Sequence, residues 1–543
     1  MGKLRIAAAV VAVAAAAAFH VWAATRFVSE QPPDSTMYVQ LAKNLIEHGS
    51  FSIDTAEPYA PTLIRLPGYP LFLAAVYSTF GIDNESAVRV SQGLIYTLTC
   101  LLAGILAAAW TNGQRRRRRA AMFTFLLAAV CPFTLVYTAA LLTETLTTTF
   151  LIGTLLAATF ALRSRKSTRS LWWWATAGLL AGLNVMLRPD AGLFAFGIGL
   201  TIVVSTLFGP GRLKIRLGDR IVKGLVFSIA FLMPLVPWTI RNEQVFGVFQ
   251  PLAPAHAEMP GEFVSHGYFL WLRTWIDDPK YISPMLWDLE LKPIDIKSVP
   301  PYAFASDDER ARVQQLLDSY NNSDPDHPAA KPTPQAEPDD SADDDSESQD
   351  DQAANNQDAG DDDHSTDEEW DLKISPEVDA GFQQLASERI EREPFRFYVW
   401  LPAKRAYAMW FDTHSDFYPF AGELFPLKDL DENTGQEIWL PLFAALNVIF
   451  SVLAFGGIIT LCFSAAYRSR MWLLLVLLTC IPRIAFFGTL ENPEPRYLVE
   501  LFILAAILAG IFIAHLRFIR ESRGIGLAIS FGEEKAEIET QDR

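Results

Sequence analysis

The sequence predicts an all-α polytopic membrane protein with about ten transmembrane helices. Half of the 543 residues are hydrophobic and the mean hydropathy is positive, a balance that is unusual for a soluble protein. Apolar runs long enough to cross a bilayer also recur along the chain. They cover approximately residues 5–24, 86–109, 120–138, 143–162, 171–187, 191–208, 221–240, 439–464, 471–489 and 497–516.

Positive charge in the short loops predicts the orientation of these spans, because loops rich in Lys and Arg stay in the cytoplasm. Such loops follow the second, fourth, sixth, eighth and tenth spans, and the run Arg115 to Arg119 is the clearest of them. With ten spans these loops all lie on one side, so both termini are expected to be cytoplasmic. The first span has a basic start like a signal peptide, but no cleavage site follows and we expect it to be retained.

The apolar segment 66–80 does not fit the pattern of a span. It has only about fifteen residues and contains two prolines near its start, which leaves it short of the length that a bilayer requires. We therefore expect an interfacial or re-entrant helix, within a first outer loop that covers residues 25–85.

These features divide the chain into modules. We expect an N-terminal seven-span catalytic module at 1–241, an extracytoplasmic insertion at 242–437, a three-span module at 438–517 and a cytoplasmic tail at 518–543. The insertion contains a disordered acidic linker at 322–371, whose composition cannot bury enough apolar surface to fold. Most of the formal charge of −17 lies in that linker, so the charge gives no reason to expect a nucleic-acid partner.

Two parts of the insertion are expected to fold. The first is aromatic and contains Tyr268, Trp271 and Trp275. The second follows the acidic linker, and its pattern predicts one long helix from Glu377 to about Phe411.

The first outer loop carries an acidic and a basic side chain. Asp34 follows two prolines and precedes an apolar stripe at helical spacing that ends at Gly49, so it is either a helix N-cap or a functional carboxylate. Arg65 precedes a Pro-Gly-Tyr turn and is either an interfacial anchor or a clamp for a phosphate, which a guanidinium binds bidentately. Together they favour chemistry on a lipid-borne phosphate.

Three further groups are predicted on the same outer face. Glu144 lies at the outer end of the fourth span, where a carboxylate either reaches water or faces a partner. Arg188 lies in an Arg-Pro-Asp connection between two spans. It is either part of a functional site or, more simply, the partner of Asp190 in a local ion pair. The loop before the last span contains Glu494, Arg496 and Tyr497.

Taken in order, these motifs resemble the GT-C superfamily of membrane glycosyltransferases. The resemblance is carried by Pro33-Asp34-x-x-x-Tyr38, Arg65-x-Pro-Gly-Tyr69, Thr143-Glu144 and Glu494-x-Arg496-Tyr497. It is greatest to the branch with the lipid A aminoarabinose transferases, the protein O-mannosyltransferases and the RgtA-like glycosyltransferases. It covers the N-terminal module and the final helix well and the insertion poorly.

The resemblance implies roles for these residues. Asp34 and Glu144 would be the catalytic carboxylates, and Arg65 with Arg496 would bind the donor phosphate. The supporting residues would be Tyr38, Tyr69, Arg188, Glu494 and Tyr497. The chain has Ile64 where the aminoarabinose branch has a glutamate associated with metal, so we assign no metal-ligating residue and leave a divalent cation open.

The sequence thus predicts a GT-C-like transferase in the bacterial cytoplasmic (inner) membrane, surrounded by membrane lipids. It would move a hexosyl or pentosyl group from a polyprenyl-phosphate sugar donor to a lipid, glycan or protein acceptor on the outer face, with inversion. The alternative is a polytopic transporter or flippase for a lipid-linked or anionic substrate, although transporters place ionisable groups near the bilayer midplane. A scaffold without catalytic activity would leave Asp34 as a cap and Arg65 as an anchor.

Overall fold

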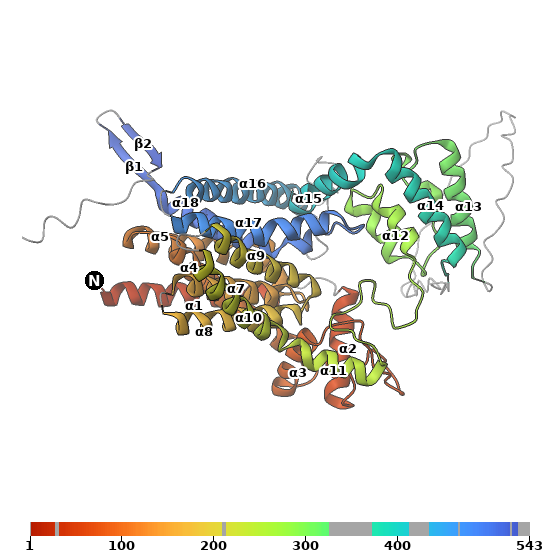
Figure 1. Ribbon diagram of the computed structural model, residues 1–543, viewed down its shortest axis with the longest axis horizontal. Coiled ribbons are helices and arrows are strands. Elements are labelled where there is room, and N and C mark those ends of the chain that lie inside the picture. Colours follow the sequence, from red (N-terminus) through yellow and green to blue (C-terminus); the bar gives the residue numbers. More distant parts are fainter. Residues whose placement is uncertain are drawn as a thin grey trace, which may run out of the picture. The chain divides into compact units, whose positions relative to one another are not determined.

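The computed structural model describes residues 2–27, 32–164, 166–208, 213–324, 372–411, 434–464, 467–521 and 524–529 (Figure 1). The chain forms two compact units. The first, here called the membrane unit, comprises Met1–Val264 and Val399–Arg543. The second, here called the inserted unit, is Ser265–Tyr398 and falls inside the expected insertion at 242–437.

The membrane unit is built from helices of very different length. Its N-terminal elements are α1 (Gly2–Arg26), α2 (Pro33–Glu47), α3 (Gly68–Phe80), α4 (Glu85–Trp110), α5 (Gln114–Ala129), α6 (Pro132–Leu135), η1 (Val136–Thr138), α7 (Glu144–Arg163), α8 (Ser167–Val185), η2 (Pro189–Ala191), α9 (Gly192–Phe208), α10 (Leu213–Leu232) and α11 (Leu235–Phe246). Its C-terminal elements are α15 (Leu401–Phe411), α16 (Thr434–Cys462), α17 (Tyr467–Gly488), η8 (Pro495–Leu498), α18 (Glu500–His515), β1 (Leu516–Glu521) and β2 (Gly524–Ile529).

The expected all-helical membrane fold is confirmed, but the count of ten spans is not. Among the described residues, 6 helices are long and apolar enough to cross a membrane, and two bent pairs raise this to 8. The bends of 57° between α5 and α6 and of 47° between α10 and α11 fall at Pro132 and Pro234, since proline cannot continue the helical hydrogen bonds. Helices α8 and α18 lie where the other two spans were expected, but neither counts as a candidate span. Helix α18 is too short for this, with only 16 residues.

Helices from both ends of the sequence share one core. Helix α18 packs against α5 and α16, and α17 packs against α9. Small residues permit these close approaches, as is usual between membrane helices. A Cβ atom at Gly197 of α9 would collide with the backbone of Leu478 in α17. The ring of Phe133, after the α5 bend, stacks on Phe502 of α18 with centroids 4.4 Å apart.

The first outer loop folds as two short helices. Helix α3 covers most of the apolar segment 66–80 and is too short to be a candidate span. Helix α2 ends where expected, because Gly49 has a φ of +65°, a conformation that stops a helix and favours glycine.

A two-stranded hairpin in the expected tail is the exception to an all-α fold. Strands β1 and β2 pair antiparallel, with Leu516 opposite Ile529. The sequence analysis predicted no strand there.

The inserted unit has its own aromatic core. Its elements are α12 (His266–Arg273), η3 (Pro279–Tyr281), η4 (Ser283–Trp287), η5 (Ile296–Ser298), η6 (Pro301–Ala303), α13 (Asp307–Asn321), α14 (Pro376–Arg392) and the start of η7 (Arg396–Trp400). The aromatic segment before the acidic linker packs on the helix that follows it. The rings of Tyr268 and Trp271 each lie 5.0 Å from the ring of Phe382 in α14. Most of the linker itself, residues 325–371, lies outside the described residues.

The prediction of a single long helix from Glu377 to about Phe411 is wrong. Helix α14 ends at Arg392, and the backbone at Glu393 leaves the helical region with a φ of −131° and a ψ of 61°. Pro394 explains the break, because its ring disfavours a helical conformation of the preceding residue. A π-helix, Arg396–Trp400, follows and leads into α15.

Candidate active site

Asp34 bridges two arginines from distant parts of the chain. Its Oδ1 accepts a hydrogen bond from Arg65 Nη2 at 2.7 Å, and its Oδ2 accepts one from Arg496 Nη1 at 3.0 Å. The interpretation of Asp34 as an N-cap is wrong: helix α2 begins at Pro33 with Pro32 as its cap, and no side chain caps it. Asp34 lies in the first turn, where a carboxylate complements the helix dipole.

Arg65 is positioned by the Pro-Gly-Tyr turn that follows it. The Gly68 amide donates to the carbonyl of Met186 at 2.9 Å, which joins this turn to the end of α8. A Cβ atom at Gly68 would lie 2.5 Å from that carbonyl oxygen, so only glycine permits the contact. The turn therefore holds Arg65 beside the connection that carries Arg188.

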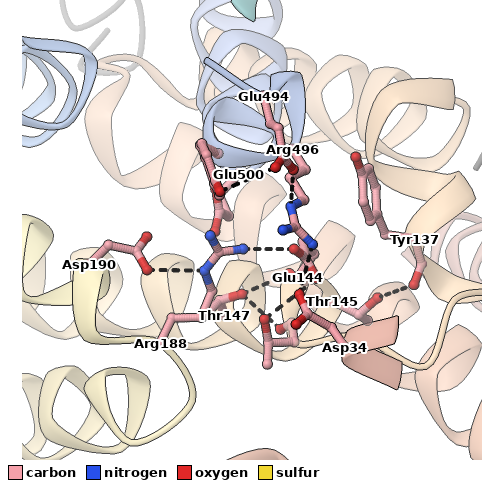
Figure 2. A network of polar contacts seen from close by, with 12 residues as sticks. Asp34, Tyr137, Glu144, Thr145, Thr147, Arg188, Asp190, Glu494, Arg496 and Glu500 are labelled. Atoms are coloured by element: carbon pink, nitrogen blue, oxygen red, sulfur yellow. Dashed lines mark hydrogen bonds and ion pairs between the residues drawn. The ribbon is translucent and has the colours of Figure 1, made fainter. Parts of the chain in front are cut away.

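Arg496 enters the site on η8, just before α18. It pairs with Glu494 as well as with Asp34. The Tyr497 ring is near two guanidiniums, with its centroid 5.5 Å from the central carbon of Arg496 and 5.5 Å from that of Arg188. Figure 2 shows Arg496 directed toward Asp34 on one side of the network and Arg188 directed toward Glu144 on the other.

Glu144 and Arg188 form the second half of the network. Glu144 Oε1 accepts from Arg188 Nη1 at 2.7 Å, and Asp190 Oδ1 accepts from Arg188 Nε at 3.1 Å (Figure 2). Glu144 is the first residue of α7, and the Thr147 hydroxyl donates to the carbonyls of Thr143 and Glu144. The local pair with Asp190 exists, but Arg188 also contacts Glu144. The interpretation that Glu144 reaches water does not hold, because its side chain is only 3 % exposed.

Arg483 and Glu500 extend the network into the helices, and neither was predicted from the sequence. Arg483 on α17 approaches both carboxylate oxygens of Glu500 on α18, at 3.2 and 3.1 Å, and it lies 2.5 Å from Asp190 Oδ2. Its Nε also donates to the Tyr497 carbonyl at 2.8 Å. An available signal was the presence of charged residues inside two apolar runs, which is costly in hydrocarbon unless partners surround them.

Exposure falls steadily across the network. The side chains of Asp34, Arg65 and Arg496 are 26 %, 22 % and 17 % exposed, whereas Arg483 and Glu500 are 0 % exposed. A ligand can therefore reach the Asp34 end directly. The Arg483 end can only hold the connections from α8 and α17 in place.

Two of the three predicted supporting tyrosines, Tyr38 and Tyr69, pack together. The rings of Tyr38 and Tyr69 meet edge to face with centroids 5.2 Å apart, and the Tyr69 hydroxyl donates to Gln92 at 2.9 Å. Burial, together with the Asp34 carboxylate, raises the pKa of Tyr38 to about 12. Tyr38 is therefore a neutral hydroxyl at ordinary pH.

The Asp34 carboxylate is held in its ionised form. Burial by itself would raise its pKa, but the Arg496 and Arg65 guanidiniums outweigh that effect and lower the pKa below the usual aspartate value. Asp34 is thus an ionised carboxylate shared by two arginines.

The structure assigns no metal ligands. Among the described residues, no three His, Cys, Asp or Glu side chains group in a way that could hold a metal ion. The divalent cation left open by the sequence therefore has no residues assigned to it.

Part of the sequence resembles a known protein family. Residues 61–238 match the family model of the dolichyl-phosphate-mannose-protein mannosyltransferases, a GT-C family, and this segment contains Arg65, Glu144 and Arg188. The match places this segment among the GT-C membrane glycosyltransferases. No curated protein matches it.

The solved structures that resemble this chain are remote from it in sequence. ArnT from Cupriavidus metallidurans bound to undecaprenyl phosphate is 13 % identical with a TM-score of 0.37, over 93 % of this chain and 77 % of ArnT. The archaeal oligosaccharyltransferase AglB from Archaeoglobus fulgidus, in complex with an inhibitory peptide and a dolichol-phosphate, is 11 % identical with a TM-score of 0.44. That match covers 92 % of this chain and 50 % of AglB.

Proposed function

We propose that this membrane glycosyltransferase takes its sugar from a polyprenyl-phosphate donor and that Arg65 and Arg496 bind the donor phosphate. The observation that carries the proposal is the pair of partly exposed guanidiniums on either side of one carboxylate. Guanidinium groups match the geometry of phosphate oxygens, and two of them can neutralise a phosphate monoester or diester. The description of the matching family, which names a dolichyl-phosphate sugar, supports the same donor class.

Donor binding changes the environment of Asp34 in this mechanism. A phosphate that pairs with Arg65 and Arg496 competes with Asp34 for the same N–H groups. The carboxylate then loses the partners that lower its pKa, so it becomes a stronger base when the donor is in place.

Asp34 then serves as general base in the transfer. It takes the proton of the acceptor hydroxyl while the hydroxyl oxygen bonds to the anomeric carbon of the sugar. The bond between that carbon and the phosphate oxygen breaks. The polyprenyl phosphate leaves as an anion, whose negative charge the two arginines neutralise. A single direct displacement inverts the anomeric configuration. Since phosphate is a good leaving group, positioning and charge neutralisation supply most of the rate.

Glu144 has a supporting role in this proposal. Its burial and its pairing with Arg188 favour a residue that positions others over one that exchanges a proton with an acceptor. Through Arg188 and the Tyr497 ring it fixes the place of Arg496. Arg483 and Glu500 hold the same connections from within the membrane unit.

We place the reaction at the outer face of a bacterial cytoplasmic membrane, with both termini inside, because of the charge distribution in the loops. The acceptor is a hydroxyl group of a lipid, a glycan or a protein. The transporter alternative is not favoured by the family assignment.

The test uses purified full-length protein in lipid vesicles with a panel of radiolabelled undecaprenyl-phosphate sugars and an envelope extract as acceptor. Transfer of label out of the donor lipid, with release of undecaprenyl phosphate and inverted configuration in the product, is the expected result. Absence of transfer from every polyprenyl-phosphate sugar, together with transfer from a nucleotide sugar, would overturn the proposed donor.

A further inference from the structure

A cavity in the inserted unit gathers three arginines with aromatic walls. It is a small, partly open cavity of about 80 Å3, and every lining residue belongs to the inserted unit. We infer that this cavity is a binding site for an anionic saccharide, with the sugar ring against the aromatic side chains and its phosphate or carboxylate group on Arg392 and Arg396.

The basic wall of the cavity is built on a fixed arginine. Arg389 is only 10 % exposed and donates through Nη1 to the Ala303 carbonyl at 2.7 Å and to Glu309 Oε1 at 2.6 Å. Arg392 lies one turn later on α14, 3.6 Å from Glu309 Oε2, and remains about half exposed. Glu309 is therefore already engaged by Arg389, which leaves Arg392 able to bind an anion.

Arg396 is the least satisfied member of the group. Its Nε is buried and has no hydrogen-bond partner among the described residues, and Glu393 Oε2 lies 3.8 Å away, beyond hydrogen-bond length. A buried donor without an acceptor costs free energy, so this N–H is available to an anionic ligand in the cavity. Arg396 also opens the π-helix, a type of helix that often occurs at functional sites.

The remaining lining residues fit a sugar. Tyr302, Phe304 and Phe397 give flat apolar surface against which a pyranose ring can pack. The Glu393 carboxylate also lines the cavity and can accept hydrogen bonds from sugar hydroxyls. A guanidinium beside a carboxylate and an aromatic wall suits a ligand that carries both hydroxyl groups and one anionic group.

The experiment measures binding of four probes to the full-length protein in lipid nanodiscs: glucose 6-phosphate, glucuronate, glucose and inorganic phosphate. At least one anionic sugar should bind more tightly than both glucose and inorganic phosphate, and the one that binds identifies the anion. Arg396→Gln should weaken this binding by about tenfold or more, the usual effect of losing a charged hydrogen bond.

The matched control is Arg312→Gln. Arg312 belongs to the same unit, but it pairs with Glu388 at 2.7 and 3.1 Å and does not line the cavity. The inference is overturned if neither anionic sugar binds, if glucose or inorganic phosphate binds as tightly, or if Arg312→Gln has the same effect as Arg396→Gln. Binding that Arg65→Ala abolishes and Arg396→Gln leaves intact would place the ligand at Asp34 and also overturn it. None of these outcomes affects the proposed transfer reaction, which uses no residue of this cavity.

Discussion

Arg496 Nη1 lies 3.0 Å from Asp34 Oδ2, although 462 positions separate the two residues in the sequence. This contact ties the loop before the last helix to the first outer loop of the chain. Arg65 donates to the other carboxylate oxygen of Asp34. Asp34 is therefore the common partner of the two arginines that are proposed to bind the phosphate.

The first prediction concerns the two arginines. Arg65→Ala and Arg496→Ala should each weaken binding of undecaprenyl phosphate by roughly 10- to 100-fold, because each removes a charged hydrogen bond. Arg65→Lys should restore only part of the affinity, since an ammonium lacks the bidentate fork. Native mass spectrometry or a lipid-binding titration measures the affinity. Unchanged affinity in Arg65→Ala would reduce Arg65 to an interfacial anchor.

The second prediction separates the role of Asp34 as general base from its pairing with the two arginines. Asp34→Asn removes the carboxylate that competes with the donor phosphate, so undecaprenyl phosphate should bind at least as tightly as in the natural protein. Turnover should nevertheless fall by about 10²- to 10⁴-fold, the usual worth of a general base. Affinity and turnover are measured on the same preparation. A fully active Asn variant would remove Asp34 from the chemistry and make Glu144 the better candidate.

The third prediction is a pH dependence. The arginines lower the pKa of Asp34 in the free enzyme, so the acid limb of kcat/KM should fall below the ordinary aspartate range of about 3.9. In the donor complex the phosphate takes these arginines, and the acid limb of kcat should lie at higher pH. Coincident acid limbs for kcat and kcat/KM would contradict the exchange of partners.

The same pKa shift has a consequence for stability. A carboxylate whose pKa is lower in the folded state stabilises the fold above its unfolded pKa and loses that contribution as pH falls through the folded value. Asp34→Asn should therefore reduce the loss of thermal stability on acidification below about pH 4. A parallel decline in both proteins would show that other groups dominate.

The fourth prediction addresses the buried pair. Arg188→Ala leaves Glu144 buried without its partner and should lower the free energy of unfolding by about 3–5 kcal/mol. The double variant Arg188→Ala with Glu144→Gln should recover part of this loss, because no uncompensated charge remains. Thermal unfolding in detergent measures both. Additive losses in the double variant would mean that the two side chains do not interact energetically.

The fifth prediction tests the turn after Arg65. Gly68→Ala places a Cβ atom 2.5 Å from the Met186 carbonyl oxygen, so the turn must move and stability should fall by about 1–3 kcal/mol. Donor affinity should fall as well, because Arg65 moves with the turn. Gly199→Ala is the matched control, since a Cβ atom there meets nothing within 4 Å. Equal effects of the two changes would remove the turn from the site.

Composition and periodicity alone determined much of this protein. Long apolar runs predicted a helical membrane fold, because no other element satisfies its backbone within hydrocarbon except a closed barrel. The residue types and their order predicted Asp34, Arg65, Glu144 and Arg496 on one face, and the resemblance to GT-C enzymes implied their roles. Pro394, two residues after the end of α14 at Arg392, was a local signal that the predicted long helix overlooked.

Only the tertiary structure decided which charges meet. Sequence separation says nothing about the contact between Asp34 and Arg496, because packing of α18 against α5 and α16 brings the two ends of the chain together. Arg483 and Glu500 each lie within an apolar run of the sequence. Their ion pair appears only in the folded chain, where α17 and α18 bring Arg483 Nη2 within 3.1 Å of Glu500 Oε2. The physical reason is that a charged side chain within hydrocarbon is costly unless it is paired. The packing of the helices determines which side chains of different helices can form such pairs.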